Sequence, residues 1–499
     1  FHKEAVMNTQ MIFPSLSAFA PEEQAAAQQF LTHLSEQIAL PDRHRRPMVA
    51  DFEKALLYYK QQGLSLAQAV ARLDAPRLGD FYLKERTDWY PLDTAAKIYP
   101  LSMGLKRMML FRLSCYLKEP VVPEIMQIAL TYTIKRFPYF ATTIKCGVFW
   151  HYVDSTMRRW ALEPETKLPC SVMTLRHEES PSLRVVYFGN RVSIEFFHVL
   201  SDGTGGAIFL RTMLAEYFRL LGHPVTLGNG AFDVNEAPSP VEWEDAFPVA
   251  DTAKKMGSFS DKRALQLKGR LSFEKPARVV QFNLPVSLLK QKAKERHVTI
   301  NTLMFAYLFM ACKQAAEPNK RNRKLQIQLP VNMRKYYPVH TLRNFSMFSS
   351  IRLHPDEVTS IDDILPEIAK QADEGMSKEN LDQTIALSRR LVSLLRFVPL
   401  VIKRPIAYLI YGFMSDVVFT SVFSNVGVIQ TPPEMAEFIE KFDAMLGPPI
   451  SNKAVFSLCS YGEHAVLTIT KNTRLPDVEE ALYRVLCDDG LEPYVEGSK

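Results

Sequence analysis

The apolar and polar positions of the chain follow two patterns. In residues 1–87 apolar residues recur at three- and four-residue spacing, as at Phe30, Leu34 and Ile38, and this spacing is typical of amphipathic helices. From residue 88 onward, short segments rich in β-favouring residues are followed by longer segments of helical period. The patterns predict a helical N-terminal appendage in residues 1–87 and an α/β region in the remainder. Because the appendage lies outside the α/β pattern, we expect the α/β region to fold without it.

Two sequence segments of the α/β region recur in the same order. The strand-like "MLFRLSCYL" (109–117) precedes a helical segment, as "RVVQFNLP" (278–285) does later in the chain. The segment "GNRVSIEFFH" (189–198) is matched in the same way by "GEHAVLTITK" (462–471). A repeated order of strands and helices indicates a duplicated α/β unit, and we expect its boundary near residue 275.

The composition favours a globular protein with more than one core. Of the 499 residues 47% are apolar and 23% are charged, a balance typical of soluble folded proteins. The formal net charge of +6 is too small and dispersed for a nucleic-acid partner, but it leaves a local anionic ligand open. The six cysteines form no Cys-x-x-Cys pair and no zinc-like cluster, so we expect no metal site. Together with the lack of a secretion-signal pattern, they favour reduced thiols in the cytoplasm.

The most apolar stretch of the sequence runs from Leu391 to Phe413. Arg396, Lys403, Arg404 and two prolines interrupt it, so it cannot cross a bilayer as a single helix. We therefore expect no transmembrane segment and a buried helix pair in this stretch. Peripheral contact with a membrane is the alternative.

Candidate chemistry is concentrated in the segment "FFHVLSDGTGG" (196–206). Side chains alternate along the predicted strand, so His198 ends the apolar face that carries Val192 and Ile194. A histidine at the carboxyl end of a strand, beside a glycine-rich turn, lies where α/β proteins commonly hold functional groups.

Other interpretations of these residues are open at this point. His198 fits a hydrogen-bonded core histidine, and Asp202 fits a plain Asx turn. A phosphate-binding glycine loop would need a further glycine at the required spacing or a following Lys-Ser/Thr pair, and neither accompanies Gly203. A metal site would need more ligands than one histidine and one aspartate.

The sequence His198-x-x-x-Asp202-Gly203 resembles the His-His-x-x-x-Asp-Gly signature of the thioester-dependent acyltransferase superfamily. This superfamily includes chloramphenicol acetyltransferases, condensation domains of peptide synthetases and alcohol acetyltransferases. One position departs from the signature, because Phe197 stands in place of the first histidine. Phe197 lies on the strand face opposite to His198, so we expect its substitution to alter the support of the catalytic position and to spare the position itself.

Further segments resemble superfamily sequences in the same order along residues 88–499. They are "WYPLDTAAKIYP" (89–100), "QLPVNMR" (328–334) followed by "LRNFSMF" (342–348), and "SNVGVIQTP" (424–432). Residues 1–87 lie outside the resemblance.

The resemblance implies a pseudodimer of two chloramphenicol-acetyltransferase-like subdomains, residues 88–275 and 276–499, each an α+β two-layer sandwich. A tunnel would run along their seam, with His198 at its middle as the general base. Lys471, which matches His198 in the duplicated unit, would leave one catalytic histidine per chain.

Other site residues are also assigned by the resemblance. Asp202 would pair with Arg334 and tie the catalytic loop to the second subdomain, and Gly203 would allow backbone angles closed to other residues. Candidate oxyanion or tunnel residues are Ser424, Asn425 and Asn344. Apart from the resemblance, the charge pattern shows a basic run from Lys320 to Lys324, which is a solvated loop or a contact for coenzyme A phosphates or for an acidic carrier protein.

The sequence therefore predicts an O-acyltransferase that moves an acyl group from a thioester, acyl-CoA or acetyl-CoA, to an alcohol. The alternatives are a stand-alone condensation enzyme that takes acyl groups from a carrier protein and forms an amide or ester, and a non-catalytic binding protein with the same fold. We expect no tightly bound cofactor, acyl-CoA or an acyl carrier protein as co-substrate, a small alcohol or amine as acceptor, and a monomer. The sequence does not identify the acceptor or the acyl length.

Overall fold

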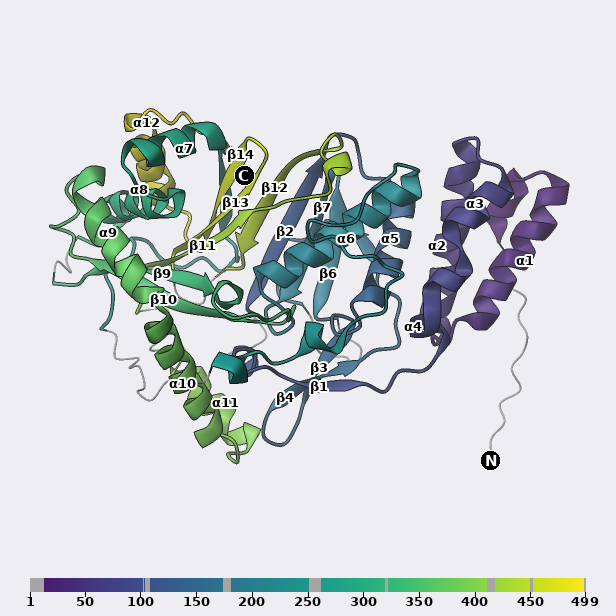
Figure 1. The fold of residues 1–499 in the computed structure, drawn as a ribbon, viewed down its shortest axis with the longest axis horizontal. Coiled ribbons are helices and arrows are strands. Elements are labelled where there is room, and N and C mark those ends of the chain that lie inside the picture. The colour runs from purple at the N-terminus through teal and green to yellow at the C-terminus, as the bar shows by residue number, and fades with distance from the viewer. Residues whose placement is uncertain are drawn as a thin grey trace.

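The computed structural model describes residues 13–101, 103, 108–173, 181–250, 262–318, 322–410, 418–448 and 452–497. Two predicted segments extend beyond these ranges, since Lys320 and Arg321 belong to the basic run and residues 411–413 to the apolar stretch. Within the described ranges the chain forms two large sheets flanked by helices, with a further group of helices at the N-terminal end (Figure 1).

The N-terminal segment is helical, as its apolar spacing predicts. Figure 1 shows these helices at one end of the molecule, on the side of the first sheet. The bounds are α1 (Pro21–Gln37), α2 (Asp42–Gln61), α3 (Leu66–Leu73) and α4 (Gly79–Leu83).

The first large sheet has the strand order β12-β2-β7-β6-β5. The helices α5 (Pro123–Arg136) and α6 (Gly203–Leu221) cover one of its faces, where Phe209 of α6 packs edge-on against Phe196 of β7. A separate small sheet has the order β1-β4-β3. The strand bounds are β1 (Trp89–Pro91), β2 (Leu110–Leu117), β3 (Thr142–Cys146), β4 (His151–Ser155), β5 (Leu162–Pro164), β6 (Leu183–Phe188), β7 (Arg191–Phe197) and β12 (Ile439–Leu446).

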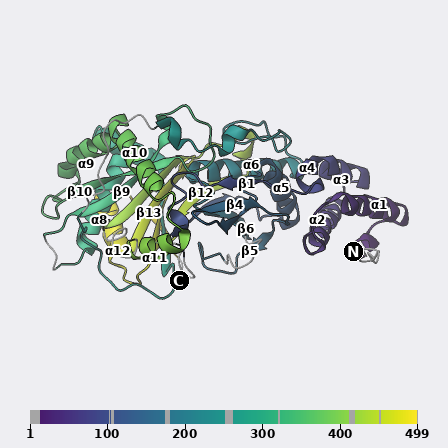
Figure 2. The same ribbon diagram turned by 90° about the horizontal axis from the view of Figure 1, so that it is seen from below.

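The second large sheet has the strand order β10-β9-β11-β13-β14-β8-β15. Helices α8, α9 and α12 pack together beside it (Figure 2). The strand bounds are β8 (Arg278–Pro285), β9 (Leu325–Asn332), β10 (Ser346–Leu353), β11 (Ser421–Val428), β13 (Ala454–Tyr461), β14 (His464–Lys471) and β15 (Tyr494–Gly497). The helix bounds are α7 (Val286–Glu295), α8 (Ile300–Ala315), α9 (Ile361–Gly375), α10 (Lys378–Leu394), α11 (Leu400–Ile410) and α12 (Asp477–Asp488).

One strand crosses between the two halves of the sequence. β12 belongs to the C-terminal half, yet it pairs antiparallel with β2 along the edge of the first sheet, with Phe442 opposite Cys115. The first sheet is therefore completed by a segment that lies far beyond residue 275.

The N-terminal helices share a hydrophobic core with the first sheet. Phe52 and Leu56 of α2 are fully buried, and they belong to the same cluster of packed apolar side chains as Ile128 of α5 and Ile194 of β7. The Tyr59 hydroxyl donates to the Leu220 carbonyl at 2.9 Å, which ties α2 to the end of α6. The appendage is thus packed into the α/β region.

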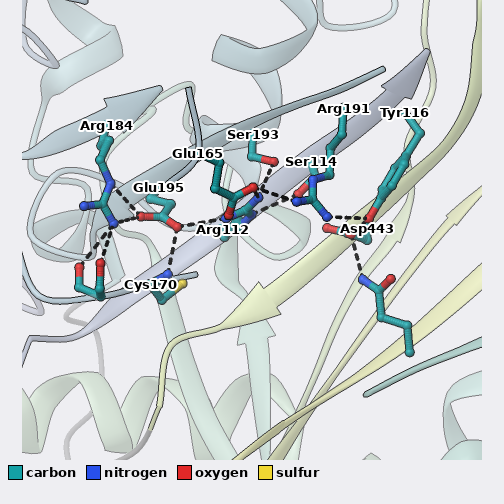
Figure 3. Close-up of polar contacts among 12 residues, drawn as sticks. Arg112, Ser114, Tyr116, Glu165, Cys170, Arg184, Arg191, Ser193, Glu195 and Asp443 are labelled. Atoms are coloured by element: carbon teal, nitrogen blue, oxygen red, sulfur yellow. Dashed lines mark hydrogen bonds and ion pairs between the residues drawn. The ribbon is translucent and has the colours of Figure 1, made fainter. Parts of the chain in front are cut away.

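The other face of the first sheet carries a network of buried charges (Figure 3). Arg112 on β2 donates to Glu165 at 2.5 and 2.9 Å and to Glu195 on β7 at 3.1 Å. Asp443 on β12 accepts from Gln281 on β8 at 2.7 Å, which links the two large sheets. Because these carboxylates are paired or hydrogen-bonded, the network holds the strands together.

No helix within the described ranges combines the length and the apolar character that crossing a membrane requires.

Candidate active site

His198 follows the last residue of β7, at the carboxyl end of that strand. Its backbone N–H donates to the Met109 carbonyl at 2.8 Å, which fixes the residue beside the start of β2. The imidazole contacts two aromatic rings, with centroid distances of 4.9 Å to Tyr99 and 5.1 Å to Phe111. The side chain is half-buried, so packing fixes the ring while part of it stays accessible.

Asn344 determines which ring nitrogen of His198 carries the proton. Its Oδ1 lies 2.8 Å from His198 Nδ1, and its Nδ2 donates to the carbonyl oxygens of His198 at 2.8 Å and Val199 at 3.4 Å. Because carbonyls only accept hydrogen bonds, the amide must turn Nδ2 toward them and Oδ1 toward the ring. Nδ1 therefore carries the proton, and Nε2 keeps the free lone pair.

This arrangement disfavours the sequence-based interpretation of Asn344 as an oxyanion donor, while its interpretation as a tunnel residue stays a prediction. Its amide hydrogens face the carbonyl oxygens of His198 and Val199, so they are not directed at a substrate oxygen. Asn344 is a positioning residue for the imidazole. Sequence reasoning missed this role because the two residues are 146 positions apart.

Burial sets the protonation state of the histidine. It lowers the pKa of His198 below its ordinary value, and the hydrogen bond with Asn344 and the nearby charge of Asp202 offset this effect only in part. The imidazole is therefore neutral at neutral pH. Neutral imidazole with a free Nε2 lone pair is the form that accepts a proton.

Asp202 joins three segments through its two carboxylate oxygens. Oδ1 caps α6 by accepting from the backbone N–H groups of Thr204 at 3.1 Å and Gly205 at 3.4 Å. Oδ2 accepts from Arg334 Nη1 at 2.8 Å and from the Phe345 N–H at 2.9 Å. The predicted contact between Asp202 and Arg334 is thus present, and both side chains are largely buried.

Arg334 organises the loop that carries Asn344. Its Nε donates to the Thr341 carbonyl at 2.9 Å, and its Nη2 donates to the Arg343 carbonyl. The Ser201 hydroxyl reaches the same loop and donates to the Leu342 carbonyl at 2.6 Å. The loop after β9 is therefore fixed against the turn after β7, which brings Asn344 to His198.

The structure corrects the conformational role predicted for Gly203. Its φ lies outside the left-handed region, and an added Cβ would meet only Val426 Cγ2 at an ordinary 3.9 Å. An added Cβ at Gly205 would instead lie 2.2 Å from both the Leu342 carbonyl oxygen and the Ser201 hydroxyl. Glycine is required at position 205, because the loop that holds Asn344 passes directly over the first turn of α6.

Ser424 and Asn425 lie on β11 and have no hydrogen bond to His198 in the described part of the chain. Ser424 is half-buried and opposite Ser457 of β13. Asn425 is exposed, donates to Asn301 at 3.3 Å and accepts from the Gly427 N–H at 2.8 Å. The proximity of Val426 to Gly203 nevertheless brings this strand to the start of α6. The role of Ser424 and Asn425 as oxyanion donors therefore stays a prediction.

A buried ion pair between Asp93 and Arg343, which the sequence did not suggest, supports the loop that holds Asn344. Asp93 is fully buried and lies 3.4 Å from Arg343 Nε, and Arg343 Nη2 donates to the Pro91 carbonyl at 2.7 Å. Burial raises the pKa of Asp93 to about 6, while Arg343 and Asn344 act to lower it. The pair anchors the segment before Tyr99 to the loop that holds Asn344.

The structure also shows the environments of two other positions singled out in the sequence, Phe197 and Lys471. Phe197 is completely buried in the first sheet. Lys471, the counterpart of His198 in the second unit, is buried and donates to the Leu475 carbonyl and to Glu479. Among the described residues, no group of three His, Cys, Asp or Glu side chains is arranged to hold a metal ion.

A scan of protein-family models and a search of curated proteins find no match to this sequence, but solved structures resemble the fold. Polyketide synthase associated protein 5 from Mycobacterium tuberculosis matches with a TM-score of 0.53 and 14% identity, over 81% of this chain and 98% of that chain. TRI3 trichothecene 15-O-acetyltransferase from Fusarium sporotrichioides matches with a TM-score of 0.53 and 13% identity, over 80% of this chain and 95% of that chain.

A mutant starter condensation domain of rhizomide synthetase RzmA, in complex with C8-CoA, matches with a TM-score of 0.52 and 12% identity, over 80% of this chain and 94% of that chain. These structures include an acetyltransferase and a condensation domain, the kinds of protein that the sequence motifs resemble. The predicted fold class is therefore confirmed. At these identities the likeness concerns the fold, and activity must be argued from the site.

Proposed function

We propose that the protein is an acyltransferase that moves an acyl group from an acyl thioester to an alcohol, with His198 as the general base. The observation that carries this proposal is the hydrogen bond between His198 Nδ1 and Asn344 Oδ1 at 2.8 Å, since it leaves Nε2 as the free proton acceptor. The lowered pKa of His198 supports the same role, because the imidazole is ready to accept a proton at neutral pH.

The reaction would proceed in one addition and one elimination on the acyl carbon. Nε2 takes the hydroxyl proton as the acceptor oxygen attacks the thioester carbonyl and a C–O bond forms. Collapse of the tetrahedral intermediate breaks the C–S bond, and the imidazolium returns the proton to the departing thiolate. These two steps account for every bond and every proton without an acyl-enzyme intermediate. Ser424 and Asn425 are the proposed donors to the oxyanion.

Acyl-CoA is the donor that we propose first, with no tightly bound cofactor. The likeness to a condensation domain in complex with C8-CoA supports this choice at the level of the fold. An acyl carrier protein is the alternative donor, and an amine the alternative acceptor, because the same base would serve amide formation.

The division into subdomains 88–275 and 276–499 with a tunnel between them is part of the proposal.

The test is a screen of acyl thioesters against mixed alcohols and amines, with products identified by mass spectrometry. On the substrate found, His198→Ala should lower kcat by roughly two to four orders of magnitude, as expected for loss of a general base. The exposed His464 provides the control, and His464→Ala should keep wild-type activity. Most of the activity surviving in His198→Ala would refute the assignment, and a screen without any product would favour a binding protein.

A further inference from the structure

Large apolar side chains are exposed together on α10, on the turn after it and on α11. Leu394, Phe397 and Val401 are 78%, 74% and 80% exposed. Isolated exposed apolar residues are normal in folded proteins, but a continuous group of them marks an interaction surface. We name this group the apolar corner, and its members are Leu391, Leu394, Leu395, Phe397, Val401, Ile402 and Ile406.

The tip of the β3–β4 hairpin extends the apolar corner. Val148 is 72% exposed, and its carbonyl accepts from the Leu400 N–H at 2.8 Å. Phe149 contacts Phe397 edge to face, with ring centroids 6.3 Å apart. The exposed apolar side chains therefore come from two segments that are far apart in the sequence.

The apolar corner is firmly attached to the protein. Lys403 is buried beneath it, where its Nζ donates to the Phe149 carbonyl at 2.7 Å and lies 3.3 Å from the ring centroid of Trp150. Burial lowers the pKa of Lys403 to about 8. The buried Lys403 fixes one face of α11 to the turn between β3 and β4. The exposed apolar side chains therefore project from a helix that is held in place.

Positive charge accompanies the apolar side chains. From Gln383 to Arg404 the sequence carries five basic residues and no acidic residue. Of these, Arg390, Arg396 and Arg404 are exposed. A helical surface that combines large apolar side chains with arginines is typical of proteins that lie on anionic membranes.

The shape of this region distinguishes a membrane from a protein partner. Figure 1 shows α10 and α11 as a corner that projects at the lower left, below the second sheet. A projecting corner suits insertion of its side chains into a soft interface, whereas an amphipathic helix is received by a groove, which a projecting corner does not offer. We propose that the apolar corner docks on the surface of an anionic lipid bilayer, with its apolar side chains among the acyl chains and the three arginines at the phosphate groups.

A consequence for the substrate rests on the proposed function. α11 packs against the 3-10 turn Tyr99–Leu101, and Tyr99 contacts the His198 ring. The helix α11, which carries part of the docking surface, is therefore connected to the proposed base through this 3-10 turn. An acceptor alcohol or an acyl chain that partitions into the bilayer would be delivered close to His198.

Docking is tested by sedimentation of the full chain with vesicles of phosphatidylcholine alone or mixed with phosphatidylglycerol. We expect binding to the mixed vesicles that weakens with added salt. Leu394→Ser with Phe397→Ser should reduce binding by roughly tenfold or more, because both side chains are lost from the inserted face. Phe188→Ser with Phe273→Ser is the matched control, since both residues are exposed elsewhere, and it should bind as the wild type does.

The electrostatic part is tested separately with Arg390→Glu and Arg404→Glu, which should remove the preference for anionic vesicles. Equal binding by the Leu394/Phe397 variant and the wild type would overturn the proposal. So would a wild type that ignores vesicles and instead dimerises through the apolar corner or binds an acyl carrier protein there. His198→Ala should bind vesicles normally, so failure of docking and failure of the catalytic proposal are separate results.

Discussion

At the scale of single residues, Asn344 is the side chain whose removal tests the tautomer argument. Asn344→Leu keeps the branched shape and removes the acceptor for Nδ1–H, so Nε2 loses its fixed role. We expect kcat to fall by roughly tenfold or more with little change in KM, because a misdirected base affects the chemical step. Steady-state kinetics on the substrate found by the thioester screen provide the measurement.

The pH dependence gives a second readout of the same variant. Activity requires neutral His198, so it falls as pH decreases through the pKa, and in the wild type burial lowers this limb below the ordinary value of about 6.5. The hydrogen bond with Asn344 raises the pKa, so the limb should move to still lower pH in Asn344→Leu. A limb that stays in place would contradict the contact.

The residues of the site differ in how far the sequence could identify them. His198 and Asp202 belong to one local motif, and Arg334 to a segment with its own resemblance, so the pattern proposed all three as candidates. The positioning role of Asn344 depends on carbonyl groups 145 and 146 positions away. No local pattern contains that information, and the same applies to the ion pair of Asp93 and Arg343.

At the scale of elements, the first turn of α6 separates two glycines that look equivalent in sequence. Gly205→Ala would place a methyl group 2.2 Å from the Leu342 carbonyl oxygen, so we expect a loss of roughly 1–3 kcal/mol in unfolding free energy and lower activity. Gly203→Ala meets only an ordinary contact and should be tolerated. Denaturant unfolding of the two variants makes the comparison, and equal stability of both would refute the close approach.

The contact between Asp202 and Arg334 connects α6 to the loop after β9, and it is tested by a double-mutant cycle. Asp202→Asn and Arg334→Met should each cost about 3 kcal/mol, because each leaves one charge buried without its partner. The side chains are only 7% and 12% exposed, so solvent screens the pair weakly. The double variant should recover part of the stability, since no lone charge remains. Additive losses would show that the two residues are energetically independent.

At the scale of the whole molecule, the sequence indicated two related units but not the strand that they exchange. β12 is largely buried, and its own sequence does not indicate which sheet it joins. Only the pairing with β2 and the hydrogen bond that the Tyr116 hydroxyl donates to Asp443 assign it to the first sheet. Pairing between distant segments is a tertiary property, so the alternation of residues within a strand cannot reveal it.

The N-terminal helices are the part of the molecule for which structure and sequence lead to opposite expectations. The apolar spacing predicted an appendage that the α/β region could lose, whereas α2 packs against α5 and its residues Phe52, Leu56 and Tyr59 are completely buried. The Tyr82 hydroxyl also donates to the Thr131 carbonyl of α5 at 3.1 Å. A chain that begins at residue 88 would expose an apolar face that is normally covered.

We therefore expect the chain that begins at residue 88 to unfold at lower denaturant concentration than the full chain, or to aggregate. The matched control introduces a protease site between Lys84 and Asp88 and cleaves the protein after folding. The two fragments should stay together in gel filtration and keep the activity of the intact chain, because the contacts between them are buried and apolar. If a chain that begins at residue 88 is soluble and has the same unfolding midpoint as the full protein, residues 1–87 are a dispensable appendage, as their apolar spacing predicts. Dissociation of the cleaved fragments would mean that the covalent link, rather than packing, holds the helices in place.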